Sequence, residues 1–184
     1  MRVLLIGTVV IWLVLELRQG ANTRSEAKVA DRGSRMVIRV ATIVGVVGSV
    51  VAKNAAPGAD IGNLAVAGWV GLCVLWSGIG LRFWSFSTLG RYFTFTVQTS
   101  SDQPVITAGP YGVIRHPSYA GVLLAVAGIG LVVGNWLSLA ILTLAVACGI
   151  VYRIRIEEAA LLQELGDPYR DYAATHKRLI PFVW

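Results

Sequence analysis

The residues best suited to chemistry lie between Gly109 and Gly121. This stretch reads Gly-Pro-Tyr-Gly-Val-Ile-Arg-His-Pro-Ser-Tyr-Ala-Gly and holds His116, one of two histidines in the chain. A residue before proline is kept out of the helical region, so we expect His116 in extended backbone. Pro117 suits the first turn of a helix, where its missing N–H costs nothing. Arg115 and His116 are therefore expected at the positive end of a helix, which is a site for an anion.

A second group of ionisable residues follows the last long apolar run. Arg153 and Glu157 stand four residues apart, so they share one face of a helix. An ionisable pair at the mouth of a membrane bundle indicates a ligand site. The alternative is an interfacial salt bridge with snorkelling arginines. His176, in the basic segment further on, is expected to be a surface histidine.

The composition around these residues indicates an integral membrane protein. The 184 residues are 55% hydrophobic and 14% charged, with a mean hydropathy of +0.67, whereas a soluble domain carries about 25% charged residues. The net charge of +6 is compatible with nucleic-acid binding. However, the basic residues lie at the ends of apolar runs, so membrane topology explains them better and we expect no nucleic-acid partner. Cys73 and Cys148 lie inside apolar runs and are expected to be small buried residues, not a disulfide or a metal pair.

The apolar runs predict an all-α integral membrane protein with five transmembrane helices in a single domain, residues 1–184. The runs are Val3–Leu17, Met36–Ala52, Ile61–Leu81, Tyr119–Val133 and Leu137–Tyr152. The first could pass for a signal peptide, but no small-residue cleavage site follows it closely. The last two are joined only by Gly134-Asn135-Trp136, which predicts a tight antiparallel helical hairpin. Residues 1–60 would hold the first two helices and residues 61–184 the core with any cofactor pocket, including a C-terminal cytosolic helical segment.

The distribution of basic residues predicts how the spans are oriented. If the connection between the first two spans is cytoplasmic, the opposite side receives only Arg2 and Lys53. The positive-inside rule then places the N-terminus outside, and the C-terminus and active site in the cytoplasm. Small residues four apart, such as Ala67/Gly71 and Gly121/Ala125, predict close contacts between helices.

Together these motifs resemble the isoprenylcysteine carboxyl methyltransferase family. That family belongs to a wider group of membrane methyltransferases that includes the phospholipid N-methyltransferases. The resemblance rests on Arg115–Gly121 followed, one helical hairpin later, by Glu157-Glu158, and it extends from about Arg82 to Pro181. It also includes Leu89-Gly90, Gly109-Pro110-Tyr111, Leu165-Gly166 with Tyr169 and Tyr172, and Leu179-Ile180-Pro181.

The resemblance implies S-adenosyl-L-methionine (SAM) as methyl donor, bound in a cytosol-facing pocket. The implied cofactor contacts are Gln98, Gln103, Pro104, Val105, Ile106, Tyr111, His116, Pro117, Ser118, Tyr119 and Glu157. Arg153 lies where the family places the arginine that binds the substrate carboxylate, and it is the catalytic residue we expect. The implied acceptor is a lipophilic small molecule or lipidated substrate that enters from the bilayer among membrane lipids. The carboxylate of an isoprenylcysteine-like substrate is the foremost candidate.

Other activities remain open from the sequence. A phospholipid-type N-methyltransferase would need a base for its amine substrate, and Glu158 or His116 are the candidates. Gly78-Ile79-Gly80 is similar to a glycine pair of that branch, although a close helix contact explains it equally well. A membrane lipid or sterol reductase that uses NADPH would have a similar bundle, but such enzymes more often show Asn-Tyr followed by Gly-Asp where this chain has Pro117–Gly121. A non-enzymatic scaffold would leave the ionisable groups without a role beyond topology.

Overall fold

Long apolar helices make up most of the molecule. The computed structural model describes the chain except residues 1, 21–27, 30–32, 91–97 and 100–103. The α-helices of the described part are α1 (Arg2–Gly20), α2 (Ser34–Ala55), α3 (Leu64–Leu89), α4 (Pro117–Val133), α5 (Trp136–Leu165) and α6 (Asp167–Thr175). The 3-10 turns η1 (Pro57–Ala59) and η3 (Gly109–Gly112) accompany them. The short strands β1 (Lys28–Val29) and β2 (Gln98–Thr99) pair antiparallel.

Three of these helices are long and apolar enough to cross a membrane. They are α2, α3 and α5, whose most apolar windows have mean hydropathies of 1.8, 1.9 and 2.1. The 17 residues of α4 form a shorter apolar helix, and α1 has 19 residues. Many large apolar side chains of α1 and α2 are exposed on the isolated chain. The described residues therefore form a helical membrane protein.

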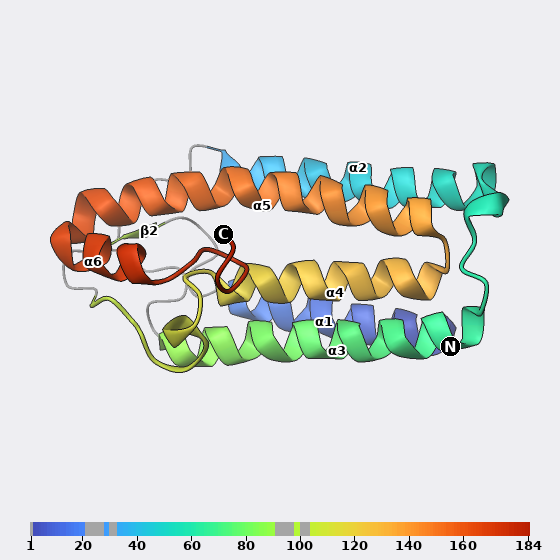
Figure 1. The fold of residues 1–184 in the computed structure, drawn as a ribbon, viewed down its shortest axis with the longest axis horizontal. Coiled ribbons are helices and arrows are strands. Elements are labelled where there is room, and N and C mark those ends of the chain that lie inside the picture. The colour runs from blue at the N-terminus through green and yellow to red at the C-terminus, as the bar shows by residue number, and fades with distance from the viewer. Residues whose placement is uncertain (1, 21–27, 30–32, 91–97, 100–103) are drawn as a thin grey trace.

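The helices run alongside one another as an elongated bundle (Figure 1). Helices α2 and α5 lie side by side, α3 and α4 form a second pair, and α1 lies beside this second pair. Leu5 and Trp12 of α1 pack against a buried cluster that contains Leu72, Leu75 and Ala125. Only Gly134 and Asn135 separate α4 from α5, so the chain reverses and the two helices run antiparallel.

Helices α3 and α4 approach so closely that glycine is required at their contact. A Cβ atom added at Gly78 would lie 2.4 Å from the backbone N of Ala125, and one at Gly128 would lie 2.4 Å from the backbone N of Leu75. Gly71 and Gly121 face comparably short contacts, which confirms the predicted close packing at these two positions. In contrast, a Cβ at Gly80 would meet nothing within 4 Å.

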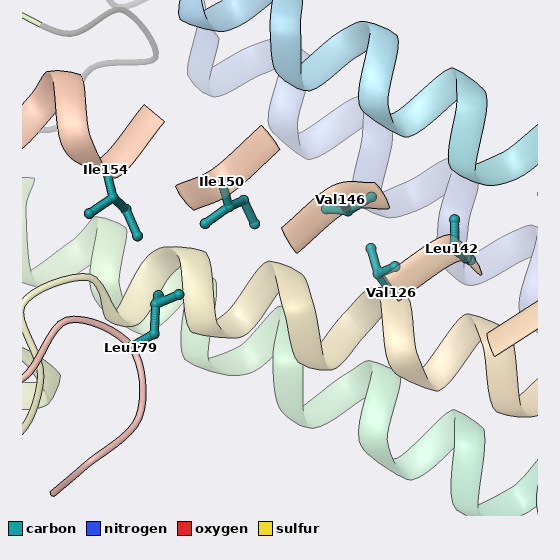
Figure 2. Packing of buried hydrophobic residues seen from close by; sticks show 6 residues of the cluster. All are labelled: Val126, Leu142, Val146, Ile150, Ile154 and Leu179. Carbon is teal, nitrogen blue, oxygen red and sulfur yellow. The ribbon is translucent and has the colours of Figure 1, made fainter. Parts of the chain in front are cut away.

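A second core joins α4 and α5 to the C-terminal segment (Figure 2). Leu142, Val146, Ile150 and Ile154 recur every four residues on α5, so they line one face of that helix. They pack with Val126 of α4 and with Leu179, which lies beyond α6. The residues after α6 are thus attached to the bundle by a buried apolar side chain.

Asn135 connects the helix pairs at the α4–α5 turn. Its side chain is fully buried, accepts from the backbone N of Ser138 at 3.0 Å and so caps the start of α5. Its amide also donates to the carbonyl of Ala56 and to Oδ1 of Asp60, each at 2.9 Å. Lys53 Nζ lies 2.8 Å from the same Asp60 oxygen. These contacts fix the end of the bundle opposite to His116.

One expectation from the sequence is corrected by the structure. Cys73 and Cys148 are free but exposed, because each points away from the helix contacts and not into them. The helical continuation expected beyond the apolar span, which puts Arg153 and Glu157 on one face, is confirmed, because α5 runs on to Leu165. The apolar run stops at Arg153, but charged residues are good helix formers, so the helix itself continues.

Candidate functional site

The turn that leads into α4 positions the central residues of the site. Pro117 is the first residue of α4, as predicted, and His116 precedes it with φ −125° and ψ 57°. This conformation lies outside the helical region, although its ψ is smaller than that of an extended strand. The side chain of His116 is buried, with 4% of its surface exposed.

The C-terminal segment holds this turn through backbone hydrogen bonds. Ile114 and Lys177 form a parallel bridge. The backbone N of Arg115 donates to the carbonyl of Lys177 at 2.8 Å, and that of His116 donates to the carbonyl of Arg178 at 2.9 Å. Residues 177–178 therefore fix the backbone direction from which the His116 side chain projects.

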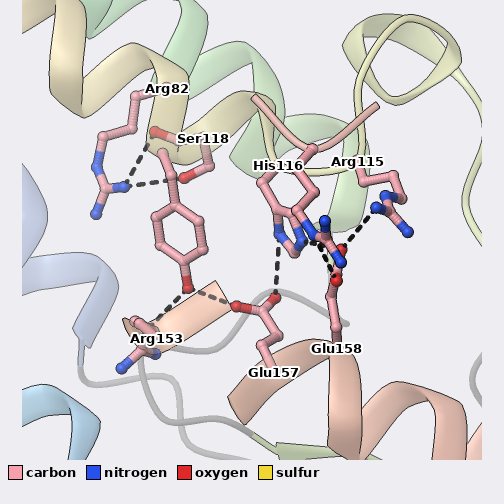
Figure 3. A network of polar contacts seen from close by, with 9 residues as sticks. Arg82, Arg115, His116, Ser118, Arg153, Glu157 and Glu158 are labelled. Carbon is pink, nitrogen blue, oxygen red and sulfur yellow. Dashed lines mark hydrogen bonds and ion pairs between the residues drawn. The ribbon is translucent and has the colours of Figure 1, made fainter. Parts of the chain in front are cut away.

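Glu158 gathers three basic side chains (Figure 3). Its Oε1 lies 3.2 Å from Nη2 of Arg115 and 3.2 Å from Nε2 of His116. Its Oε2 accepts from Nε of Arg178 at 2.8 Å. The sequence suggested that Arg115 and His116 bind the anionic group of a ligand. In the structure both side chains contact the carboxylate of Glu158. Glu158 is nearly buried, and these partners offset the cost of burying its charge.

A chain of hydrogen bonds joins Glu157 to Arg153 through Tyr119. The hydroxyl of Tyr119 donates to Oε2 of Glu157 at 2.6 Å and accepts from Nε of Arg153 at 2.7 Å. Nη1 of Arg153 donates to Oγ of Ser34, the first residue of α2, at 3.2 Å. The other oxygen of Glu157 lies 4.0 Å from Nδ1 of His116. Side chains from α2, α4 and α5 therefore form one network.

Arg82 and Glu16 form a further ion pair that the sequence analysis missed. Arg82 Nη2 donates to Oε2 of Glu16 at 2.8 Å, and its Nη1 donates to Oγ of Ser118 at 2.9 Å. The guanidinium also lies over the ring of Phe86, 4.6 Å from its centroid. The sequence held one signal for this pair. Glu16 is the only charged residue in the apolar run Val3–Leu17, and a charge within a membrane segment indicates a partner or a function.

Tyr111 is fixed by α6 at the edge of this site. It is buried, and its carbonyl accepts from the hydroxyl of Tyr172 at 2.6 Å. Burial raises the pKa of Tyr172 to about 12, so its hydroxyl stays a donor at neutral pH. Burial also raises the pKa of Tyr169, whose hydroxyl has no hydrogen-bond partner among the described residues.

The remaining expected cofactor residues are described only in part. Gln98 lies in β2, which contacts α5, but its side chain and the whole of Gln103 are outside the described residues. Pro104 is exposed, whereas Val105 and Ile106 are half-buried in the segment before η3. The structure thus brings together His116, Ser118, Tyr119, Arg153 and Glu157, with Pro117 as the helix start between them.

The two adjacent glutamates offer different chemistry. Glu158 is 8% exposed and is occupied by its three basic partners. Glu157 is 29% exposed, so its carboxylate can accept hydrogen bonds from an amino group or hydroxyl of a ligand. Arg153 supplies a buried cation on the same face of α5, one turn earlier. The arrangement suits a zwitterionic ligand beside a second, anionic one.

The fold and this site define the class: a helical membrane protein with a polar site where its helices meet the C-terminal segment. A model of the isoprenylcysteine carboxyl methyltransferase (ICMT) family matches residues 69–163, just over half of the chain. The chain belongs to this family, and the match contains Arg82, His116, Arg153 and Glu157.

Individual relatives agree with this assignment. The protein-S-isoprenylcysteine O-methyltransferase of Tribolium castaneum is 38% identical over 116 residues, which are 62% of this chain and 41% of the relative. That of Schizosaccharomyces pombe is 30% identical over 105 residues, or 56% of this chain and 44% of the relative. The structure of the eukaryotic intramembrane Ras methyltransferase ICMT superposes with a TM-score of 0.65 at 32% identity, covering 79% of this chain and 52% of that one. The chain thus spans about half the length of these relatives.

Proposed function

We propose that the protein is a SAM-dependent methyltransferase of the membrane that methylates the carboxylate of an isoprenylcysteine-like acceptor. The names of its relatives support the substrate class. The observation that carries the proposal is the hydrogen-bonded chain Arg153–Tyr119–Glu157, because it joins the expected acceptor-binding arginine to expected cofactor residues.

The residues present suit SAM. The partly exposed carboxylate of Glu157 would accept from the amino group or ribose hydroxyls of SAM. The start of α4 would face the carboxylate of SAM. Two buried polar atoms near this cluster, Arg115 Nε and Tyr169 Oη, have no hydrogen-bond partner among the described residues. Buried polar groups are normally paired, so a polar ligand at this place would satisfy them. Gln98, Gln103, Pro104, Val105, Ile106, Tyr111 and Ser118 complete the proposed cofactor set.

The chain's own residues would contribute alignment and a dry environment. When bound, SAM supplies an electrophilic methyl group. A carboxylate is already nucleophilic at neutral pH, so the acceptor needs no general base. Arg153 would bind that carboxylate and aim it, while the surrounding helices exclude water. This proposal gives Glu158 and His116 positioning roles and not proton transfer.

The surroundings of Arg153 support a lipophilic acceptor that arrives from the bilayer. Its side chain is 5% exposed and lies beside Ser34, at the start of an α2 whose outer face is apolar. We further propose five spans within one domain, with α1 and α4 crossing as well, the N-terminus outside, and the C-terminus and site in the cytoplasm. The asymmetry of basic residues supports this orientation.

Ligand binding by the purified full chain in detergent tests the proposal. Calorimetry should show binding of SAM and none of NADPH. Glu157→Ala should weaken SAM binding, whereas Gln163→Ala, an exposed position on the same helix, should not. Binding of NADPH without SAM would indicate a reductase, and binding of neither would contradict an enzyme that uses these cofactors.

A further inference from the structure

We propose that Glu16 of α1 is a positioning residue for the turn His116–Tyr119 and acts on it through Arg82. This inference rests on the proposed function, because that turn is the proposed cofactor site. It assigns a role to α1, which lies outside the segment that matches the family.

The Glu16–Arg82 pair has a fixed geometry. Arg82 uses Nε and Nη2 on the two oxygens of Glu16, so the pair is bidentate. Both side chains are largely buried, at 10% and 16% exposed. Nε1 of Trp12, one turn earlier on α1, donates to Glu16 Oε1 at 2.9 Å. The carboxylate is therefore held from its own helix as well as from α3.

The third guanidinium nitrogen of Arg82 contacts α4. Its Nη1 donates to Oγ of Ser118 at 2.9 Å and reaches the Ser118 carbonyl at 3.5 Å. A guanidinium is a planar, rigid fork, so fixing two nitrogens on Glu16 sets the direction of the third. The position of Ser118 thus depends on Glu16, and Ser118 precedes Tyr119, the link between Glu157 and Arg153.

Other contacts attach α1 to the bundle. Leu5 and Trp12 pack on the α3–α4 cluster, and Trp76 Nε1 donates to Thr8 Oγ1 at 3.2 Å. The Leu5 packing and the Trp76–Thr8 hydrogen bond join α1 to α3 without involving Glu16. An ionisable residue in a membrane helix is costly. Here Glu16 pairs with Arg82, which in turn donates to Ser118 of the His-Pro-Ser-Tyr motif. Thr8 supplies the matched control, since it links the same two helices without reaching that motif.

The test measures SAM affinity by calorimetry on the full chain in detergent. Glu16→Gln should weaken SAM binding roughly tenfold, the scale expected when a charge-assisted hydrogen bond is lost. Thr8→Val should leave the affinity within about twofold of wild type, although either change could lower the Tm slightly. With an S-farnesylated cysteine acceptor, Glu16→Gln should raise the KM for SAM while kcat at saturating SAM changes less than about threefold. Equal SAM affinity in wild type and Glu16→Gln would overturn this inference and leave the proposed function standing.

A double variant covers the case in which Glu16→Gln removes the ion-pair partner of Arg82 and the protein does not fold. Glu16→Gln with Arg82→Gln removes both charges, and it should bind SAM as weakly as Arg82→Gln alone. Wild-type affinity in the double variant would overturn the inference. A further loss beyond that of Arg82→Gln would show that Glu16 does not act through Arg82 and would also overturn it. Failure of the wild type to bind SAM would instead overturn the proposed function, and the inference with it.

Discussion

Glu157 and Glu158 are neighbours in the sequence but point about 100° apart around α5, since an α-helix has 3.6 residues per turn. Glu158 faces Arg115, His116 and Arg178, whereas Glu157 faces Tyr119 and is partly exposed. We therefore expect one carboxylate to maintain the site and the other to bind ligand.

Glu158→Gln tests the maintaining role. The change leaves the largely buried Arg115 without its counter-charge and removes the ionic partner of the more exposed Arg178. Breaking a buried pair costs about 3 kcal/mol. Thermal unfolding in detergent should show a Tm lowered by roughly 6–12 °C for a chain of this size. Glu157→Gln is the matched control and should reduce SAM affinity with a much smaller shift in Tm. Equal shifts in the two variants would contradict the division of roles.

Arg153→Ala tests the acceptor site. Loss of a hydrogen-bonded charge partner should reduce methyl transfer to a carboxylate acceptor by roughly 100-fold, because the acceptor is no longer aimed. Affinity for SAM, measured by calorimetry, should fall much less, by no more than roughly tenfold, because Arg153 reaches the proposed cofactor residues through the Tyr119 hydroxyl. Gln163→Ala, at an exposed position on the same helix, serves as control and should leave both methyl transfer and SAM affinity unchanged. Unchanged turnover in Arg153→Ala would rule out the assigned role.

At the scale of the elements, the α3–α4 contact sets the separation between Arg82 and the start of α4. Gly78 and Gly121 lie at this contact, and a Cβ at Gly121 would come within 2.9 Å of the backbone N of Arg82. The same close packing that joins the two helices thus brings Arg82 within reach of Ser118. Substitutions here should affect both stability and the site.

Gly78→Ala and Gly80→Ala form a matched pair for this contact. The first places a methyl group 2.4–2.5 Å from backbone atoms of α4, so the helices must separate. We expect a cost of about 1–3 kcal/mol, as for overpacking elsewhere. Gly80 has open space around its Cβ position, and alanine there should be neutral or slightly stabilising. Equal Tm values in detergent for the two variants would contradict the packing described.

The positions of most helices along the chain could be predicted from the sequence, because they depend on local signals. Apolar runs marked the positions of α1 to α5, and the His116-Pro117 order marked the start of α4. The continuation of α5 beyond its apolar span was also predicted, from the spacing of Arg153 and Glu157. Pairs distant in sequence, such as Glu16–Arg82 and Glu158–Arg178, were missed. Hydrophobic pattern indicates which segments are embedded but not which faces of two helices meet.

At the scale of the whole molecule, the C-terminal segment covers the end of the bundle that holds the site. Leu179 enters the α4–α5 core, the backbone of residues 177–178 pairs with residues 115–116, and Arg178 reaches Glu158. The Arg178 guanidinium also lies over the Trp184 ring, 5.3 Å from its centroid. The opposite end of the bundle is held separately by Asn135. The last residues should therefore matter for ligand binding more than for the bundle itself.

Deletion of residues 176–184 tests this division. The deletion removes the backbone partners of Arg115 and His116 and one basic partner of Glu158, so SAM affinity should fall by at least roughly tenfold. The helical content, followed by circular dichroism, should remain close to that of the full chain. Phe182→Ala is the control, because Phe182 is 96% exposed and its loss should leave SAM affinity unchanged. Full SAM affinity in the deleted chain would contradict the closing role.

The most direct test of the central claim is transfer of a labelled methyl group from SAM to an S-farnesylated cysteine derivative by the purified full chain. A carboxyl methyl ester is hydrolysed by base, whereas an N-methyl amine is not, so base treatment of the extracted product identifies the acceptor atom. We predict label in the lipid phase that base releases as methanol, and that depends on Arg153. Base-stable label, or label transferred only to an aminophospholipid, would contradict the carboxyl methyltransferase account.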